Sequence, residues 1–526
     1  SETPREATAS VRVLVDALFP LADMSDGTHG VTILGVEDRS DFGSSVAIGD
    51  VDGDSAADAI IGAPLADASD TDNGAAYVVF GGAAAVSAGT IDVATLDGTA
   101  GFSIVGLAAR DYLGAVVAVL GDVNDDGVDD FAVSATGADN IVTDNGAMYV
   151  VFGSAGLGAG GSIDVSALDG TNGFTIIGLG DDFGLGWAVS PAGDFNNDGI
   201  DDFVVSAPSA TYADVPVGAA HIIFGGASIG STGYVPLASL DGTDGFAFFG
   251  TNDGDFVGSS LAAIDDFNGD GINDLIIAAD SVDRTLPPPD DDVVVVNCGA
   301  AYVVFGGAGV GAGGSMQAGD LNGTNGLMIL GFREQELAGY RVASPGDFNG
   351  DGHSDVALGA PYADVGGNNA GLLYVVYGGP TVGASGLVDL LDLYAAVGFV
   401  MPGQANGDFA AYSLGTGADV NSDGAPDLLV GVPNKDTSVF EPGTGSVYVL
   451  YGQSGIGAGG SAEFSEIDGP NGFEVRGIDV IDAAGSAVSG RADFDGDGVP
   501  DIIVGAENAS RGDIRPGAAY IVFGLD

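Results

Sequence analysis

Seven short acidic stretches carry the residues best suited to chemistry. The fifth reads "DFNGDGHSD" (347–355), and all seven follow the pattern D-x-[DN]-x-D, with a further Asp at the ninth position. Carboxylate and amide oxygens at alternating positions around a tight turn form a hard-oxygen cage that suits Ca²⁺ better than Mg²⁺. The copies begin at Asp50, Asp122, Asp194, Asp266, Asp347, Asp419 and Asp493, with spacings of 72, 72, 72, 81, 72 and 74 residues. The sequence therefore predicts up to seven calcium sites.

Four side chains of each loop are the predicted metal ligands. Asp-rich turns also form without metal, but seven copies in register favour a metal-binding role. A helix–loop–helix site would need Glu at the twelfth position, where Val133 and Leu358 stand in the second and fifth loops. The first site should bind most weakly, because Ser55 replaces the turn glycine of the other loops. The predicted ligands are Asp50, Asp52, Asp54, Asp58, Asp122, Asn124, Asp126, Asp130, Asp194, Asn196, Asp198, Asp202, Asp266, Asn268, Asp270, Asp274, Asp347, Asn349, Asp351, Asp355, Asp419, Asn421, Asp423, Asp427, Asp493, Asp495, Asp497 and Asp501.

The elements that position these loops are short β-strands. An apolar stretch such as "AVVAVLG" (115–121) precedes a loop, and a strand such as "DAIIGAP" (58–64) follows it. The repeat continues with "GAAYVVFG" (74–81) and, after a Gly-rich stretch, "GTIDVATLDG" (89–98). Four β-rich segments in each of seven repeats predict an all-β fold, a closed seven-bladed β-propeller of four-stranded antiparallel blades.

The two ends of the chain supply complementary parts of one repeat. The seventh repeat stops after its third strand, "GAAYIVFG" (517–524), and residues 19–35 resemble residues 91–106. We expect residues 19–24 to provide the missing strand of the last blade, which would close the ring and remove exposed sheet edges. The predicted organisation is an N-terminal extension at 1–18 and one propeller over 19–526.

The repeat also carries two tripeptide signatures. "DFG" occurs at 41–43 and 182–184, and "GAP" or a close variant occurs at 62–64, 206–208, 359–361 and 431–433. By these motifs the sequence resembles the FG-GAP repeat family, as found in the propeller of integrin α subunits, over residues 19–526. It looks like a secreted bacterial relative, since the inserted adhesion domain of some integrins is missing and no DxSxS motif occurs.

The resemblance implies further features. Hairpin loops of the propeller would hold Ca²⁺, helped by the main-chain carbonyl of the seventh loop residue: Ala56, Val128, Ile200, Ile272, His353, Ala425 and Val499. It also implies an extracellular or cell-surface adhesion module. The N-terminal "SETPREATAS" lacks a signal-peptide pattern, so we expect either a removed signal or an excised segment.

Charge narrows the choice of partner. The 526 residues include 75 acidic and 12 basic ones, for a formal net charge of −63. Such a field repels nucleic acid and anionic membrane surfaces, and no apolar run is long enough to span a membrane.

One cysteine, Cys298, excludes an intrachain disulfide framework. We expect a monomer that binds a surface protein or glycan.

Loops on one face are the predicted recognition surface. In a four-stranded meander the metal loops between strands 1 and 2 share a face with the 3–4 loops, so the 2–3 and 4–1 loops lie opposite. The 2–3 loops vary most, and variable loops on a constant scaffold often bind ligands. The longest is 281–297, and another contains Arg511-Gly512-Asp513, the tripeptide that integrins recognise. Inert surface loops remain an alternative for both.

A catalytic constellation is not evident. The three histidines, His29, His221 and His353, stand in a turn, a strand and a metal loop, and no Ser/His/Asp spacing or phosphate-binding loop occurs. We therefore expect a non-enzyme. The alternatives are a purely structural calcium-stabilised module of a larger surface protein and, less favoured, a polysaccharide- or lipid-acting enzyme domain.

Overall fold

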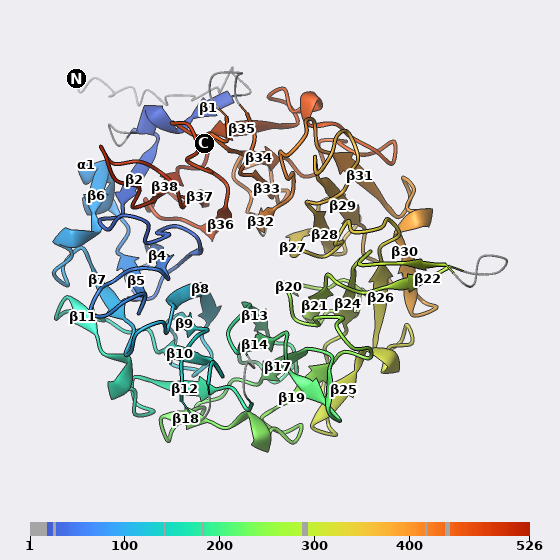
Figure 1. Cartoon of the computed structure of the whole chain (residues 1–526), viewed down its shortest axis with the longest axis horizontal. Helices are drawn as coiled ribbons and strands as arrows, with labels where there is room; N and C mark the ends of the chain where they lie inside the picture. The colour runs from blue at the N-terminus through green and yellow to red at the C-terminus, as the bar shows by residue number, and fades with distance from the viewer. Residues whose placement is uncertain are drawn as a thin grey trace, which may run out of the picture.

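Seven small antiparallel sheets surround a central channel in the computed structural model of the chain (Figure 1). The structure describes residues 18–24, 28–140, 143–180, 184–286, 293–415, 418–436 and 442–525. Each sheet is one blade, numbered here by the metal loop that it carries, so blade 1 holds Asp50 and blade 7 holds Asp493. The predicted closed seven-bladed β-propeller is confirmed.

The four antiparallel strands of each blade run from the channel to the rim. The first strands are β3 (Val46–Gly49), β8 (Leu113–Gly121), β13 (Val189–Gly193), β20 (Leu261–Ile264), β27 (Arg341–Gly346), β32 (Ser413–Gly415) and β36 (Ala487–Ala492). The second strands are β4 (Asp58–Ala63), β9 (Asp130–Ala135), β14 (Asp202–Ala207), β21 (Asp274–Ala279), β28 (Asp355–Ala360), β33 (Leu428–Val432) and β37 (Asp501–Ala506). The third strands are β5 (Ala75–Val79), β10 (Ala147–Val151), β17 (Ala219–Ile223), β24 (Ala300–Val304), β29 (Leu372–Val376), β34 (Ser446–Leu450) and β38 (Ala518–Val522). The fourth strands are β7 (Gly101–Val105), β12 (Gly173–Ile177), β19 (Gly245–Phe249), β26 (Gly326–Leu330), β31 (Gly398–Pro402), β35 (Gly472–Arg476) and β2 (Gly30–Leu34).

A fifth, parallel strand extends six of the sheets at the rim. It comes from the 3–4 connection of the following repeat, so it joins neighbouring blades. These strands are β11 (Ser162–Ile163) in blade 1, β18 (Tyr234–Val235) in blade 2, β25 (Ser315–Gln317) in blade 3, β30 (Leu387–Asp389) in blade 4, β1 (Leu18–Pro20) in blade 6 and β6 (Thr90–Asp92) in blade 7. In blade 5 a single parallel bridge between Val400 and Ser461 takes this place.

The predicted fourth segment of the repeat is wrong. The segment "GTIDVATLDG" (89–98) forms the short linking strand β6, whereas "GFSIV" (101–105) forms β7 and pairs antiparallel with β5. The reason lies at Asp92, whose side chain accepts a hydrogen bond from Ala94 N–H and ends the strand in the 3₁₀ turn η2 (Val93–Thr95). The true fourth strand has the buried/part-exposed alternation of a rim strand.

The same shift corrects the closure of the ring. An N-terminal strand does complete the last blade, but it is β2, which pairs antiparallel with β38 from Gly30–Val522 to Leu34–Ala518. Residues 19–24 instead contribute to β1, parallel to β35 of blade 6, and to the 3₁₀ helix η1 (Leu21–Met24). The two ends of the chain are therefore joined at two successive blades.

Helices and extra hairpins are small. The one α-helix of the described residues is α1 (Ala83–Ala88), and no helix there is long and apolar enough to cross a membrane. Two 2–3 loops carry hairpins, β15–β16 and β22–β23. The strands of these hairpins are β15 (Thr211–Tyr212), β16 (Val215–Pro216), β22 (Arg284–Thr285) and β23 (Val294–Val295). The remaining 3₁₀ helices are η3 (Val165–Ala167), η4 (Leu237–Ser239), η5 (Ala318–Asp320), η6 (Leu390–Asp392) and η7 (Phe464–Glu466).

The hydrophobic core lies between the blades. The second and third strands are buried along nearly their whole length, for example β9 and β10. Ile60 and Val78 of blade 1 belong to one buried cluster with Val117 and Val133 of blade 2. Each blade thus depends on its neighbours for its core, which is the usual reason that such rings close.

The central channel contains two cavities, one toward each face of the ring. The larger, about 580 Å³, lies among the metal loops, and the smaller, about 210 Å³, lies at the other end. Six apolar side chains of the first strands line both cavities: Val46, Val189, Leu261, Val342, Leu414 and Val488. These side chains form a collar between two chemically different chambers.

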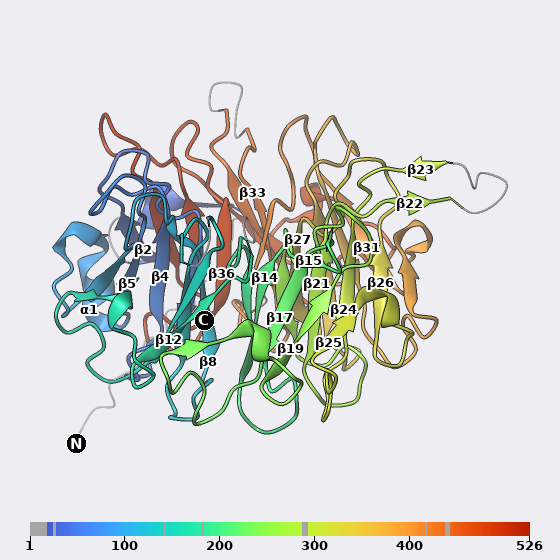
Figure 2. The same cartoon turned by 60° about the horizontal axis from the view of Figure 1, so that its bottom comes forward.

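The loops divide between the two faces as the meander predicts. On one face, the start of the 3–4 loop contacts the metal loop, where Gly81 N–H donates to Asp58 Oδ1 (3.1 Å). On the other, 2–3 and 4–1 loops contact each other, where Arg110 N–H donates to the carbonyl oxygen of Thr71 (2.9 Å). Figure 2 shows the β22–β23 hairpin at the upper edge of the ring, on this second face.

Candidate metal centres

The first aspartate of each metal loop shapes the turn. In the fifth loop, Asp347 Oδ1 accepts hydrogen bonds from the backbone N–H of Gly350 (2.8 Å) and Asp351 (2.9 Å). Asp347 Oδ2 accepts one from Gly352 N–H (2.9 Å). The loop therefore wraps around this carboxylate, and the same bonds to the fifth and sixth residues recur in all seven loops.

The third and fifth residues are held by the same turn. Asn349 Oδ1 accepts a hydrogen bond from Asp351 N–H (2.8 Å), and Asp351 Oδ1 accepts one from His353 N–H (3.1 Å). The bond from the seventh residue to the fifth is present in every loop, with lengths from 2.8 Å in the first to 3.1 Å in the second and fifth. Backbone donors thus fix the direction of each loop carboxylate.

The ninth residue anchors the loop to the rest of the blade. Asp355 is buried, and its Oδ2 accepts from Asn349 N–H (3.1 Å) while its Oδ1 accepts from Gly378 N–H (2.9 Å). Burial raises the pKa of Asp355 to about 8, and the Asp351 and Asp347 carboxylates add to that shift. The equivalent pKa is raised to about 8 for Asp58, Asp130, Asp427 and Asp501 and to about 7 for Asp202 and Asp274, always with burial as the largest cause.

A glycine at the end of each third strand belongs to this arrangement, although it is not among the residues predicted from the sequence. Gly378 donates to Asp355, and a Cβ at Gly378 would lie 2.3 Å from the carbonyl oxygen of Ser354. Only glycine permits this close approach. In the sequence this glycine can be recognised because it directly follows the Phe or Tyr at the end of each third strand. The seven glycines are Gly81, Gly153, Gly225, Gly306, Gly378, Gly452 and Gly524.

In two loops the structure brings three of the predicted ligands together. Oxygen atoms of Asp50, Asp52 and Asp58 lie within 4.8 Å of one another, and those of Asp493, Asp495 and Asp497 do the same. These are the two loops with an aspartate at the third position. Ligation by the carbonyl of the seventh residue stays a prediction.

Two loops contain acceptors that lack a donor. The side-chain Oδ1 atoms of Asn124 and Asn196, both third-position residues, are buried and have no hydrogen-bond partner. A buried acceptor without a donor is costly, and a hard cation would satisfy it. Together with a donor set made only of oxygens, this fits a divalent cation such as Ca²⁺.

The first loop keeps its geometry at a cost. Ser55 has φ 78°, the left-handed conformation that glycine adopts at this position in the other six loops. Its N–H still donates to Asp50 Oδ2 (2.9 Å). The loop is therefore formed but strained, by roughly 1–2 kcal/mol for a residue with a Cβ.

Comparison with known proteins connects this loop geometry to a family. The FG-GAP repeat family matches residues 42–79, 185–223, 338–376, 410–450 and 484–522, each spanning the first three strands and the metal loop of one blade. Integrin alpha-5 of Xenopus laevis is 30% identical over 267 residues, which is 50% of this chain and 21% of the relative. Integrin alpha-V of Gallus gallus is 30% identical over 261 residues, 49% of this chain and 21% of the relative.

Five of its seven blades are FG-GAP repeats, as in a propeller similar to those of integrin α relatives.

The chain is also similar to a second kind of relative. Phosphatidylinositol-glycan-specific phospholipase D of Homo sapiens is 30% identical over 251 residues, 47% of this chain and 26% of the relative. The matched regions of these relatives are thus about a fifth to a quarter of their own lengths. The comparison supports a propeller shared with these relatives. The activity of each whole relative is not thereby assigned to this chain.

Toward the opposite face, the FG-GAP propeller carries buried tyrosine–acid pairs that the sequence analysis did not identify. In blade 5, Tyr374 Oη donates to Glu336 Oε2 (2.8 Å), and Arg333 donates to Tyr374 Oη (2.7 Å). A buried acid stands at this position of the 4–1 loop in five repeats: Asp111, Asp255, Glu336, Asp408 and Asp482. The signal is the acid three residues before the glycine that opens the first strand, except in blade 6, where an alanine replaces that glycine.

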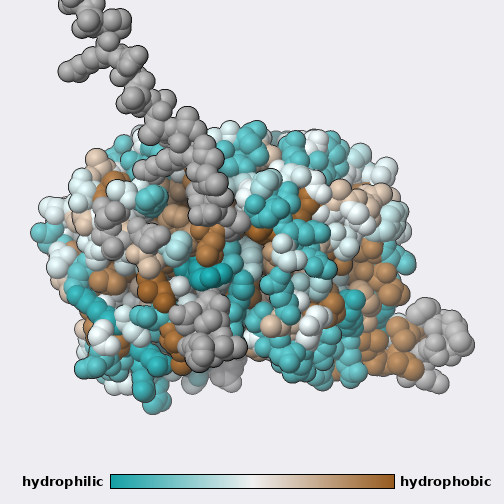
Figure 3. Space-filling model, turned by 90° about the horizontal axis from the view of Figure 1, so that it is seen from above, coloured by the Kyte–Doolittle hydropathy of each residue, from teal (hydrophilic) through white to brown (hydrophobic). Residues whose placement is uncertain are grey.

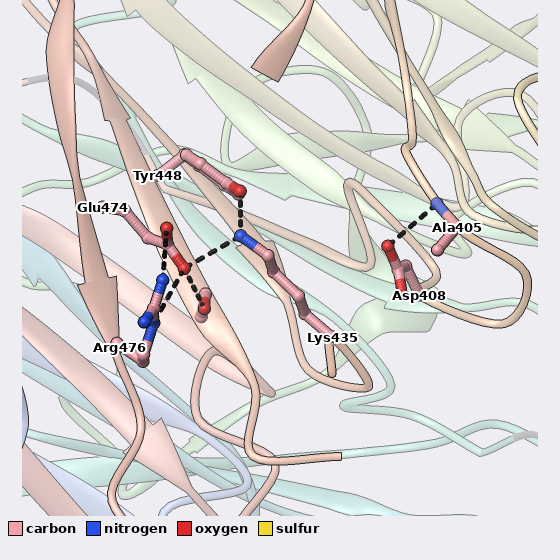
Figure 4. Close-up of polar contacts among 7 residues, drawn as sticks. Ala405, Asp408, Lys435, Tyr448, Glu474 and Arg476 are labelled. Atoms are coloured by element: carbon pink, nitrogen blue, oxygen red, sulfur yellow. Dashed lines mark hydrogen bonds and ion pairs between the residues drawn. The ribbon is translucent and has the colours of Figure 1, made fainter. Parts of the chain in front are cut away.

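In blade 6 the equivalent tyrosine, Tyr448, belongs to a charged network (Figure 4). Lys435, the only lysine of the chain, donates to Tyr448 Oη and to Glu474 Oε1 (2.9 Å), and Arg476 lies 3.2 Å from Glu474 Oε2. Burial alone would raise the Glu474 pKa, but Lys435, Ser446 and Arg476 hold that pKa below its usual range. The network links the 2–3 loop to the third and fourth strands.

Blade 3 carries His221 at the position of the buried tyrosines. His221 is 2% exposed, and burial lowers its pKa to about 4. The corresponding 4–1 loop residue in the sequence is Phe183, which lies outside the described residues. The buried position of His221 indicates a packing role.

The Arg-Gly-Asp loop has a structural partner. Arg511 lies 2.7 Å from Asp92 Oδ2 of β6 and donates to the carbonyl oxygen of Gly35 (3.4 Å). In blade 4, Arg284 makes the same contacts to Asp389 (2.6 Å) and the carbonyl of Gly331 (3.3 Å), without any Arg-Gly-Asp sequence. We call these two contacts the rim braces, since each ties a 2–3 loop to the outermost strand.

Proposed function

We propose that this propeller is a calcium-binding, extracellular recognition module that engages a surface protein or glycan through its 2–3 and 4–1 loop face. The observation that carries the calcium assignment is the set of seven equivalent oxygen-lined loops, two of which bury a third-position amide oxygen without a donor. Integrin relatives support the extracellular and adhesive assignment.

Calcium would be held by the first, third, fifth and ninth side chains of each loop. When bound, the ion neutralises carboxylates that repel one another by roughly 4 kcal/mol per pair at about 4 Å and an effective dielectric of about 20. The ninth aspartate, such as Asp355, connects each loop to the end of a third strand through Gly378 and its equivalents. Metal binding would thus stiffen the scaffold that carries the opposite loops.

We propose a non-catalytic role. Two of the three histidines have structural positions, with His221 in the core and the backbone of His353 in a metal loop. The chain also matches only about a quarter of the human phospholipase D. A structural module without a ligand is the alternative that the following experiment separates.

Metal stoichiometry tests the calcium assignment. Native mass spectrometry of the chain in Ca²⁺ should show up to seven bound ions, and Mg²⁺ should compete poorly. Asp355→Asn should lose one ion. The matched control is Asp214→Asn, in an exposed turn of the β15–β16 hairpin, which should lose none.

Ligand capture tests recognition. The chain would be applied to arrays of glycans and matrix proteins with calcium and with chelator. Calcium-dependent retention on one ligand class supports the recognition module. Absence of retention by a folded, calcium-loaded chain would overturn it and favour the structural module.

A further inference from the structure

The channel mouth opposite the metal loops is chemically unlike the rest of the ring. Its cavity of about 210 Å³ is lined by the segments that open the first strands, including Ser44, Trp187, Ser260 and Arg341. We call this cavity the axial mouth. It lies on the 2–3 and 4–1 loop face, and the apolar collar separates it from the acidic chamber among the metal loops.

Trp187 is the feature of the axial mouth that the fold does not require. It is the only tryptophan of the chain, and 58% of its side chain is exposed. Blades 1, 4 and 7 place a serine at the same position, Ser44, Ser259 and Ser486, and complete the same ring. A large aromatic surface is therefore presented to solvent where a serine suffices for folding.

Further aromatic side chains stand near the same end of the channel. Tyr340 and Tyr412 occupy the Trp187 position in blades 5 and 6, with ring centroids 5.4 Å apart. The Arg341 guanidinium lies over the Tyr340 ring at 4.8 Å and donates to the Tyr340 carbonyl oxygen (2.9 Å). A positively charged ligand would meet this arginine, so the aromatic groups favour a different occupant.

Hydroxyl groups complete the lining. Ser45 Oγ accepts from Val117 N–H (2.9 Å) and Ser260 Oγ accepts from Val342 N–H (3.2 Å), which leaves each hydroxyl proton for another acceptor. Ser44 Oγ is buried and has no hydrogen-bond partner. The mouth thus offers oriented polar groups beside flat apolar rings.

We propose that the axial mouth binds a saccharide, with Trp187 as the stacking platform and the serine hydroxyls and Arg341 as hydrogen-bonding groups. A sugar ring presents apolar C–H faces and a rim of hydroxyls, which match an aromatic plane and polar donors. A purely apolar ligand would leave the serine hydroxyls without hydrogen-bond partners. This inference rests on the proposed recognition function and names the ligand class and the site within that face.

The test uses the calcium-loaded full chain. Because Trp187 is the only tryptophan, its emission reports on the mouth directly during titration with neutral hexose oligosaccharides and with uronic-acid oligosaccharides. Calorimetry on variants follows. Trp187→Ala should weaken binding by about tenfold or more. Tyr394→Ala, at an exposed aromatic residue in a 3–4 connection and outside the 2–3 and 4–1 loops, should change it by less than about twofold. Arg341→Met should weaken uronate binding selectively if the acidic sugar is the ligand.

Each outcome decides a separate point. Saccharide binding that Trp187→Ala leaves intact would overturn the site. If neither saccharide class binds while a protein ligand is retained on the array, the recognition function stands and the saccharide inference fails. If nothing is retained at all, both fail. An unchanged melting temperature of the calcium-loaded Trp187→Ala variant shows that any loss comes from the mouth and not from unfolding.

Discussion

The two faces of the ring are built on different rules. On the metal-loop face, the same hydrogen bonds recur in all seven blades, down to the glycine that meets the ninth aspartate. On the opposite face, the backbone contacts recur but the side chains differ, as Tyr374–Glu336, Lys435–Glu474 and His221 show. The first face is constrained by one shared loop geometry, whereas the second is free to diversify.

The outer wall offers a third surface with less organisation. Figure 3 shows a mixture of hydrophilic and hydrophobic residues there, with hydrophobic residues gathered toward the side on which blade 4 lies. Exposed apolar residues of that blade include Val293, Val294, Leu387 and Leu391. These residues belong to one side of the ring, so the contrast between the two faces does not extend to the wall.

The largest predicted effect comes from removing calcium, which acts on one face alone. Each filled site stabilises the fold by about 2.7 kcal/mol when calcium stands at about 100 times its dissociation constant. Chelator should therefore lower the melting temperature strongly in scanning calorimetry, and added Ca²⁺ should restore it. A melting temperature that chelator leaves unchanged would remove the metal assignment from this face.

The second-largest effect is the pH dependence of stability that His221 causes. Since the folded-state pKa of His221 is lowered to about 4, the unfolded chain, with an ordinary pKa near 6.5, binds more protons between these values. Stability from neutral His221 is complete above about pH 6.5 and falls by about 3 kcal/mol as the pH drops to about 4. Relative to wild type, His221→Phe should lose this dependence in denaturant titrations. Tyr302→Phe, at the same position in blade 4, serves as control and should keep it.

The two rim braces should contribute differently to the stability of the fold, because their arginines are buried to different extents. The Arg284 side chain is 9% exposed, so Arg284→Met should destabilise the chain by about 2 kcal/mol because it leaves Asp389 without its partner. The Arg511 side chain is 41% exposed, and Arg511→Met should cost less than about 1 kcal/mol. Urea unfolding compares the two. Equal losses of unfolding free energy in the two variants would show that solvent exposure of the arginine does not determine how much each brace stabilises the fold. Loss of ligand capture in Arg511→Met alone would assign the Arg-Gly-Asp loop to recognition.

The smallest effect returns to the metal face. Ser55→Gly should relieve the strain at φ 78°, but the greater freedom of glycine in the unfolded chain offsets part of the gain. We expect a net stabilisation below about 1 kcal/mol and tighter calcium binding at the first loop, measured by calorimetry. Weaker binding in this variant would contradict the prediction that the first site is limited by its turn.

The sequence was informative wherever function and fold depend on local spacing. The positions of the acidic loops could be predicted because Asp347, Asn349 and Asp351 stand at fixed steps within nine residues. The fourth strand could not, since both "GTIDV" and "GFSIV" are short β-rich segments and only pairing distinguishes them. The Tyr374–Glu336 pair joins residues 38 apart. Such a pair becomes visible in the sequence only when repeats are aligned and their buried acids compared.

The closing strand has a consequence for how the chain is made. Strand β2 lies near the beginning of the described chain, and its antiparallel partner β38 lies near the end. During synthesis, β2 must wait until nearly the whole ring has emerged before it can pair, and the growing arc carries an unpaired edge throughout. Completion is therefore a late, long-range step, and a chain interrupted before β38 would present open sheet edges to other molecules.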